Sequence, residues 1–182
     1  MQGFNFYIVS RLVWNADTDW RATLEEYCEK FFGPAGRTML QYYNRIRRAS
    51  QEAVRGTGGG YSWLDGLKAS NCNNEMETLL RRGLAEAATE QQRSRIGLIL
   101  DTYHAHTMWR EMTPLIKGEG NQKPTKDEFT KIKPLAERFV SFFETKQREP
   151  MFKKFSSSYG VYHWSNYVIY YLRNPGGHGW RP

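Results

Sequence analysis

The chain has 182 residues and a formal net charge of +7, and aromatic residues make up 15% of it. This length allows one domain with a sizeable core, whereas its 2 cysteines are too few for a disulfide framework or a zinc site. We find no apolar run of about eighteen residues, as a membrane span requires, and no signal peptide, so we expect a soluble chain without an export signal.

Residues 4–14 are the first apolar element. This stretch, FNFYIVSRLVW, is apolar nearly all round, and Phe4, Ile8 and Leu12 follow one another at four-residue steps. The spacing favours a buried helix, although a short stretch rich in β-branched and aromatic residues is also consistent with a strand. Because so apolar an element follows Met1 directly, we expect another protein surface to cover it.

Residues 20–48 predict two antiparallel helices that meet at Gly33 and Pro34, with the second reaching about Arg55. Gly33 suits the left-handed conformation that ends a helix, and Pro34 suits a first helical turn because its missing N–H would have no partner there. Residues 15–19 supply side chains that cap a helix, so their acids need no catalytic role. The core-facing residues are Leu24, Tyr27, Cys28, Phe31 and Phe32 on the first helix, then Ala35, Met39, Tyr42, Tyr43, Ile46 and Ala49.

Residues 56–74 predict a connector between helical regions. Their glycine-rich run lacks the Gly-Lys-Ser/Thr of a phosphate-binding loop, so flexibility is the simpler explanation. Helical spacing resumes at residues 75–90, and the helix expected at 92–117 has two apolar faces, which is typical of a helix between layers. The buried stripe of residues 75–90 consists of Met76, Leu79, Leu80, Gly83, Leu84, Ala87 and Ala88.

The last third of the chain predicts one more clear helix. Thr125 and Glu128 form a capping box in front of an apolar stripe, and Pro134 should kink this helix or split it. Residues 162–172 are aromatic and are consistent with a strand or a last helix. The whole pattern predicts an all-α fold, an irregular bundle of six to seven helices with antiparallel helical hairpins. We expect a single domain at 1–182, with a hairpin core at 1–55, the connector at 56–74, and further helices with an aromatic tail at 75–182.

We find no set of residues that predicts catalysis, a metal site or a cofactor. His104 and His106 lie two positions apart on a helix and point about 200° apart, so one metal ion cannot readily use both. Glu25, Glu26 and Glu29 are expected on a solvated helix face, which does not place two carboxylates across a cleft as glycoside hydrolysis requires.

Two sets of side chains are candidates for binding. Aromatic rings can stack on sugars, although core packing is the simpler explanation for most rings here. Arginines and lysines could bind an anionic polymer, although the basic residues are spread along the chain and mixed with acids. The sugar candidates are Tyr61, Trp63, Trp164 and Trp180, and the polyanion candidates are Arg45, Arg47, Arg48, Arg55, Lys153 and Lys154.

Three stretches share a pattern with other proteins: YIVSRLVWNADTD at 7–19, FFGPA with MLQYY at 31–43, and RIGLILDTY at 95–103. Together they resemble the C-terminal helical region of a family of uncharacterised glycoside-hydrolase-like proteins, in which a TIM-type barrel precedes a helical bundle. The resemblance covers about residues 4–110. Ala16 stands where the family usually has proline, and the barrel, whose strand ends would hold catalytic carboxylates, is missing, so no functional residue carries over.

The resemblance implies a non-catalytic helical accessory domain of a carbohydrate-active protein, which buttresses a missing barrel through residues 4–14. The expected partners are that barrel or another protein surface and, through the aromatic rings, a carbohydrate; no cofactor and no membrane are expected. The alternative is a stand-alone basic module that binds nucleic acid or an acidic polysaccharide, with nucleic acid the less expected of the two. The sequence leaves the location open, with secretion of a parent protein as one option.

Overall fold

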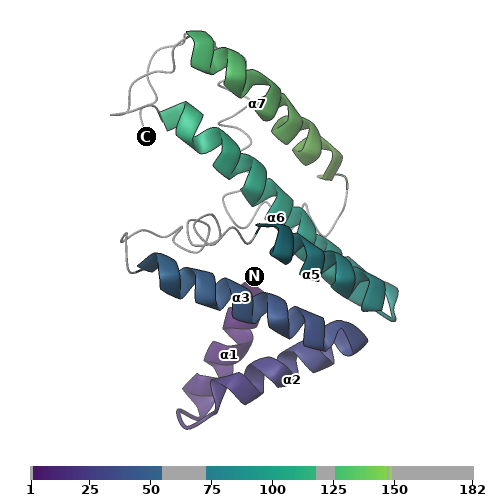
Figure 1. The fold of residues 1–182 in the computed structure, drawn as a ribbon. Helices are drawn as coiled ribbons and strands as arrows, with labels where there is room; N and C mark the ends of the chain where they lie inside the picture. The colour runs from purple at the N-terminus through teal and green to yellow at the C-terminus, as the bar shows by residue number, and fades with distance from the viewer. Residues whose placement is uncertain (1, 55–72, 118–125, 147, 149–182) are drawn as a thin grey trace. The chain divides into compact units, whose positions relative to one another are not determined.

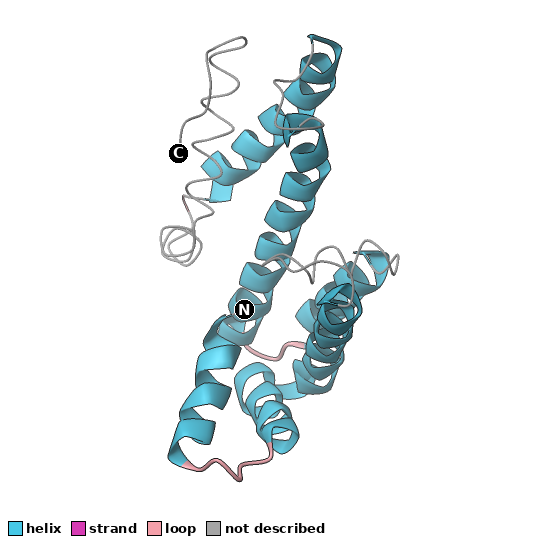
Figure 2. Ribbon diagram, turned by 90° about the vertical axis from the view of Figure 1, so that its left-hand side faces the viewer, coloured by secondary structure: helices cyan, strands magenta, loops and turns pink. Residues whose placement is uncertain are grey.

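The structure, a computed structural model, describes residues 2–54, 73–117, 126–146 and 148. These residues form α-helices, a 3-10 turn and a few short loops, and no strand occurs among them (Figure 2). The all-α class is therefore confirmed. The glycine-rich run, the capping residue Thr125 and the aromatic stretch 162–172 lie outside the described residues. The expected number of six to seven helices therefore stays a prediction.

The chain divides into two compact units, residues 1–100 and 101–182, and the boundary falls inside one helix, α6 (Glu90–Lys117). The first unit begins with α1 (Gln2–Trp14), which confirms the preference for a helix over a strand there. It continues through α2 (Trp20–Phe32), a 3-10 turn η1 (Gly33–Ala35), α3 (Gly36–Val54) and α5 (Asn73–Glu86) (Figure 1). The expected single domain stays a prediction.

The hairpin of α2 and α3 is the core of the first unit. An oxygen of the Asp19 side chain accepts the backbone N–H of Arg21 at 2.8 Å and so caps α2, as its position predicts. At the other end Gly33 has φ 57° and ψ −127°, a positive-φ conformation that favours glycine, but its ψ lies outside the left-handed helical region expected there. The second helix does not begin at Pro34, however, because Pro34 lies in the 3-10 turn and α3 starts at Gly36.

The predicted stripes of the two helices face each other and are buried. Aromatic rings meet between them, since the Tyr43 ring of α3 lies 6.5 Å from Tyr27 and 6.3 Å from Phe32 of α2, centroid to centroid. Phe31 and Ile46 are half-buried. The remaining predicted positions are fully buried: Leu24, Tyr27, Cys28, Phe32, Ala35, Met39, Tyr42, Tyr43 and Ala49.

α5 packs closely on α3 at Gly83. A Cβ added at Gly83 would lie only 3.1 Å from the Met39 sulfur. Met76, Leu79, Leu80, Gly83 and Ala87 are buried, but Leu84 is half-buried and Ala88 is exposed.

The helix boundaries around α5 differ from the prediction at both ends. α5 already includes residues 73 and 74, which were assigned to the connector, and it ends at Glu86 rather than at residue 90. The short link between α5 and α6 ends at Thr89. The Thr89 hydroxyl accepts the backbone N–H of Gln92, and the Gln92 side chain accepts the backbone N–H of Thr89, both at 3.2 Å. This reciprocal capping starts a new helix, α6, two residues earlier than expected.

The second unit contains the rest of α6 and α7 (Lys126–Lys146). Pro134 lies inside α7, and the helix is not split there. Its ring is on an exposed face, where water can hydrogen-bond the backbone that the proline disturbs. Lys146 and Asp101 form an ion pair at 2.8 Å, with most of both side chains buried. The buried residues are Thr102, Tyr103, Ala105, Ile132, Ala136, Phe139 and Phe143.

Cys28 is the small buried hydrophobe that its position in α2 predicts, with 1% of its surface exposed. Burial raises the pKa of the Cys28 thiol to about 12. Because the thiolate is the reactive form, we expect native Cys28 to resist iodoacetamide at about pH 8 and to react only after unfolding in urea. Mass spectrometry of a Cys72→Ser variant measures this cysteine alone, and rapid labelling of the native chain would contradict its placement.

Candidate functional site

The large apolar side chains that are exposed all lie on α1, as far as the structure describes the chain. Phe6 is 66% exposed, Val9 54%, Val13 82% and Trp14 93%. Phe6, Val9 and Val13 follow one another at steps of three and four, so they share one side of the helix, whereas Trp14, at the end of the helix, points about 100° away from Val13. We name these four residues the α1 face. Exposed large apolar side chains gathered on one helix mark an interaction site in many soluble proteins.

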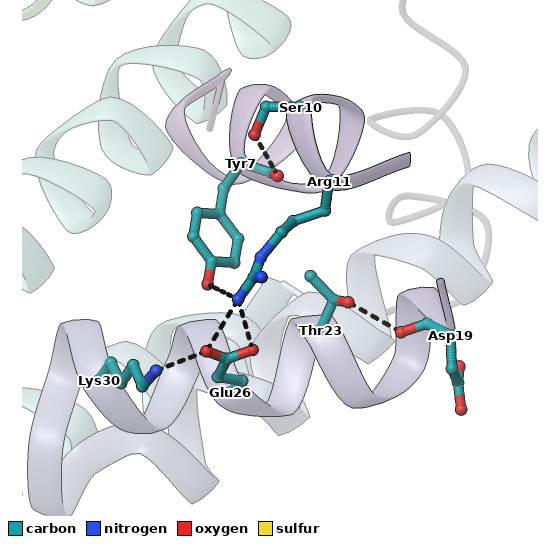
Figure 3. A network of polar contacts seen from close by, with 7 residues as sticks. All are labelled: Tyr7, Ser10, Arg11, Asp19, Thr23, Glu26 and Lys30. Atoms are coloured by element: carbon teal, nitrogen blue, oxygen red, sulfur yellow. Dashed lines mark hydrogen bonds and ion pairs between the residues drawn. The ribbon is translucent and has the colours of Figure 1, made fainter. Parts of the chain in front are cut away.

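The opposite side of α1 is fastened to α2. The Tyr7 ring lies 5.4 Å from the Tyr27 ring, and an Arg11 nitrogen lies 3.1 Å from both Glu26 oxygens and 3.2 Å from the Tyr7 hydroxyl (Figure 3). Lys30, one turn further along α2, donates to the same Glu26 carboxylate. These contacts fix which side of α1 faces the core.

The α1 face itself contains no charged side chain. Arg11 is the one Lys, Arg, Asp or Glu of Gln2–Trp14, and on the other side of the helix it pairs with Glu26, which also pairs with Lys30. The hydrogen bond from Lys30 and the charges of Lys30 and Arg11 lower the pKa of Glu26, so this carboxylate stays ionised. An exposed pair like this contributes little stability, and its effect here is to orient α1.

The arginines proposed for polyanion binding point to different neighbours. Arg45 pairs with Glu75 on α5 at 3.0 Å, and Arg47 lies over the ring of Trp20 on α2, 5.4 Å from its centroid. Arg48 is exposed. Arg45 and Arg48 line a groove of about 290 Å³ between α3 and α5, together with Gln41, Asn44, Glu75 and Leu79. Arg55, Lys153 and Lys154 lie outside the described residues.

The other predicted site residues add no second site. Tyr61, Trp63, Trp164 and Trp180, the sugar candidates, all lie outside the described residues, so their role stays a prediction. Within the described ranges no three His, Cys, Asp or Glu side chains gather as a metal site would require. Glu25 and Glu29 are exposed on α2, as expected, whereas Glu26 is half-buried and pairs with Arg11. None of the described helices has the length and apolar composition needed to cross a membrane.

Comparison with known proteins identifies no relative. No protein family, no curated protein and no solved structure matches this chain. The resemblance to glycoside-hydrolase-like proteins therefore stays a prediction, and the geometry of the α1 face is the main guide to function.

Proposed function

We propose that this chain is a non-catalytic helical domain that docks onto another protein through the α1 face. The observation that carries the proposal is the exposure of four large apolar side chains on one helix, while the opposite side of that helix is held by Arg11 and Glu26. Leaving Trp14 and Val13 in water is unfavourable, because apolar surface gains free energy when another surface covers it.

The partner in this proposal is an apolar patch on a glycoside-hydrolase-like TIM-type barrel. The α1 face is neutral and contains two aromatic rings, and the centres of protein interfaces are depleted in charge and enriched in aromatic residues. The resemblance of residues 4–110 supports the barrel as the partner. The proposal also includes the finer architecture, an irregular bundle of six to seven helices, and a carbohydrate-active parent protein.

Replacing Val13 and Trp14 with lysine should abolish this docking. The Val13→Lys/Trp14→Lys variant is expected to bind a purified barrel of the resembled family at least about 30-fold more weakly, because aromatic residues at interface centres dominate affinity. Its free energy of unfolding should stay within about 0.5 kcal/mol of that of the unaltered chain, since exposed side chains with few contacts contribute little to folding. Isothermal titration calorimetry measures the binding, and urea unfolding measures the stability.

Ser94→Lys is the matched control, because Ser94 is exposed on α6 and the variant also gains positive charge. It should bind as tightly as the unaltered chain. Equal binding by the α1 variant would contradict the docking face. Light scattering provides a second check. If the unaltered chain forms a dimer and the Trp14→Lys variant is a monomer, the α1 face serves self-association instead of binding to the barrel. Glycoside hydrolysis by the pure chain, lost on changing one acid, would overturn the non-catalytic role.

A further inference from the structure

Two arginines lie against the indole ring of Trp20. The guanidinium carbon of Arg21 is 4.8 Å from the ring centroid, and that of Arg47 is 5.4 Å from it. Trp20 and Arg21 begin α2, whereas Arg47 belongs to α3, so the antiparallel hairpin brings them together. We name these three residues the Trp20 cluster.

Neither arginine of the Trp20 cluster forms an ion pair with an acid of the described residues. Asp17 and Glu25 lie four positions before and after Arg21 and are exposed, and the Asp19 carboxylate accepts the backbone N–H of Arg21, but none of the three pairs with its guanidinium. Most other arginines of the described residues are different, because each has a glutamate partner: Arg11, Arg45, Arg81, Arg82, Arg93 and Arg138.

Arg47 is the less exposed of the two arginines. Its Nε atom is buried and has no hydrogen-bond partner among the described residues. A cation that has lost part of its hydration in this way is stabilised in part by the face of the indole. An anion at the terminal nitrogens of the same guanidinium would stabilise it further, because fewer water molecules compete there than at a fully solvated arginine.

We propose that the Trp20 cluster binds a phosphate group, with the guanidinium groups of Arg21 and Arg47 donating hydrogen bonds to its oxygens. The planar guanidinium matches phosphate in charge and in the spacing of its donors. Because guanidinium groups lie over the indole, Trp20 holds the two cations in place and does not stack on the ligand. Both a free phosphate ion and the phosphodiester chain of a single-stranded nucleic acid carry this group, and the experiment below separates the two sources.

Arg21→Gln tests the site without disturbing the core, because Arg21 is exposed. We expect this variant to bind a fluorescein-labelled oligothymidine about tenfold more weakly than the unaltered chain at low salt, measured by fluorescence anisotropy. The dependence of log affinity on log salt should also become shallower by about one ion, because one phosphate contact is lost. The double variant Arg21→Gln/Arg47→Gln should lose specific binding, with circular dichroism as the check on its fold.

Arg37→Gln is the charge-matched control, since Arg37 is exposed on α3 and forms no ion pair with a described acid. An equal loss in this control would show that net charge alone attracts the oligonucleotide, and the proposal would be wrong. Calorimetry with inorganic phosphate separates the two sources of the group. Phosphate binding that requires Arg21, without tighter binding of the oligonucleotide, would confirm the site and assign it to the free ion. No binding of either probe would overturn the proposal.

Discussion

Gly36→Ala is expected to lower the free energy of unfolding by about 3 kcal/mol, at the upper end of what overpacking a core produces. A Cβ at residue 36 would lie 2.8 Å from the carbonyl oxygen of Cys28 and 2.9 Å from the Cα of Glu29. Both atoms belong to the backbone of α2, so no side chain can rotate to make room. The start of α3 would have to move away from the end of α2, and the buried rings between them would lose contacts. Urea unfolding followed by circular dichroism measures the loss.

Gly97→Ala is the matched control for this prediction. Gly36 has φ −55° and ψ −43°, which alanine adopts readily, so space alone opposes its replacement. Gly97 lies within α6 and has nothing within 4 Å of an added Cβ. Alanine should therefore stabilise the helix there by about 0.5–1 kcal/mol, because glycine loses more conformational freedom than alanine when the chain folds. If both variants were equally stable, the close approach of α2 and α3 would be disproved.

The hairpin could be predicted from sequence because its determinants are local. Apolar residues at steps of three and four identify the buried sides of α2 and α3, and Gly33 marks the end of the first helix. The need for glycine at residue 36 could not be predicted, because it depends on the distance between two helices. Thr89 and Gln92 show the opposite case: they have the spacing of a capping box, and this local signal could have placed the start of α6 correctly.

The orientation of α1 shows what periodicity leaves out. The spacing of Phe4, Ile8 and Leu12 marks one side of this largely apolar helix, and Ile8 and Leu12 are half-buried. It does not predict that Arg11 also faces α2, where Glu26 offers it an acid. The contact joins residues far apart in the sequence, and it exposes Phe6 and Val13. The Trp20 cluster depends on tertiary structure in the same way, since only the register of the hairpin places Arg47 over Trp20.

Mild acid is expected to destabilise the second unit through His106. This residue is half-buried, its Nδ1 atom has no exposed surface, and burial lowers its pKa to about 4. The ordinary histidine pKa is about 6.5, so below that pH the unfolded chain takes up a proton that the folded chain does not. Stability should therefore be constant above about pH 6.5, fall as the pH drops, and stop falling from this cause below about pH 4.

The expected loss is about 1 kcal/mol between pH 7.5 and pH 5.5, and about 3 kcal/mol once the folded imidazole also titrates. The comparison at pH 5.5 is the more diagnostic one, because most carboxylates are still ionised there. Urea unfolding at both pH values should show this loss in the unaltered chain and in His104→Gln, the neighbouring control on α6, but not in His106→Gln. If His106→Gln kept the full pH dependence, the source would be another group and the imidazole would be accessible to solvent. If only His106→Gln lost the pH dependence, this result would establish that His106 is buried in its neutral form in the folded chain.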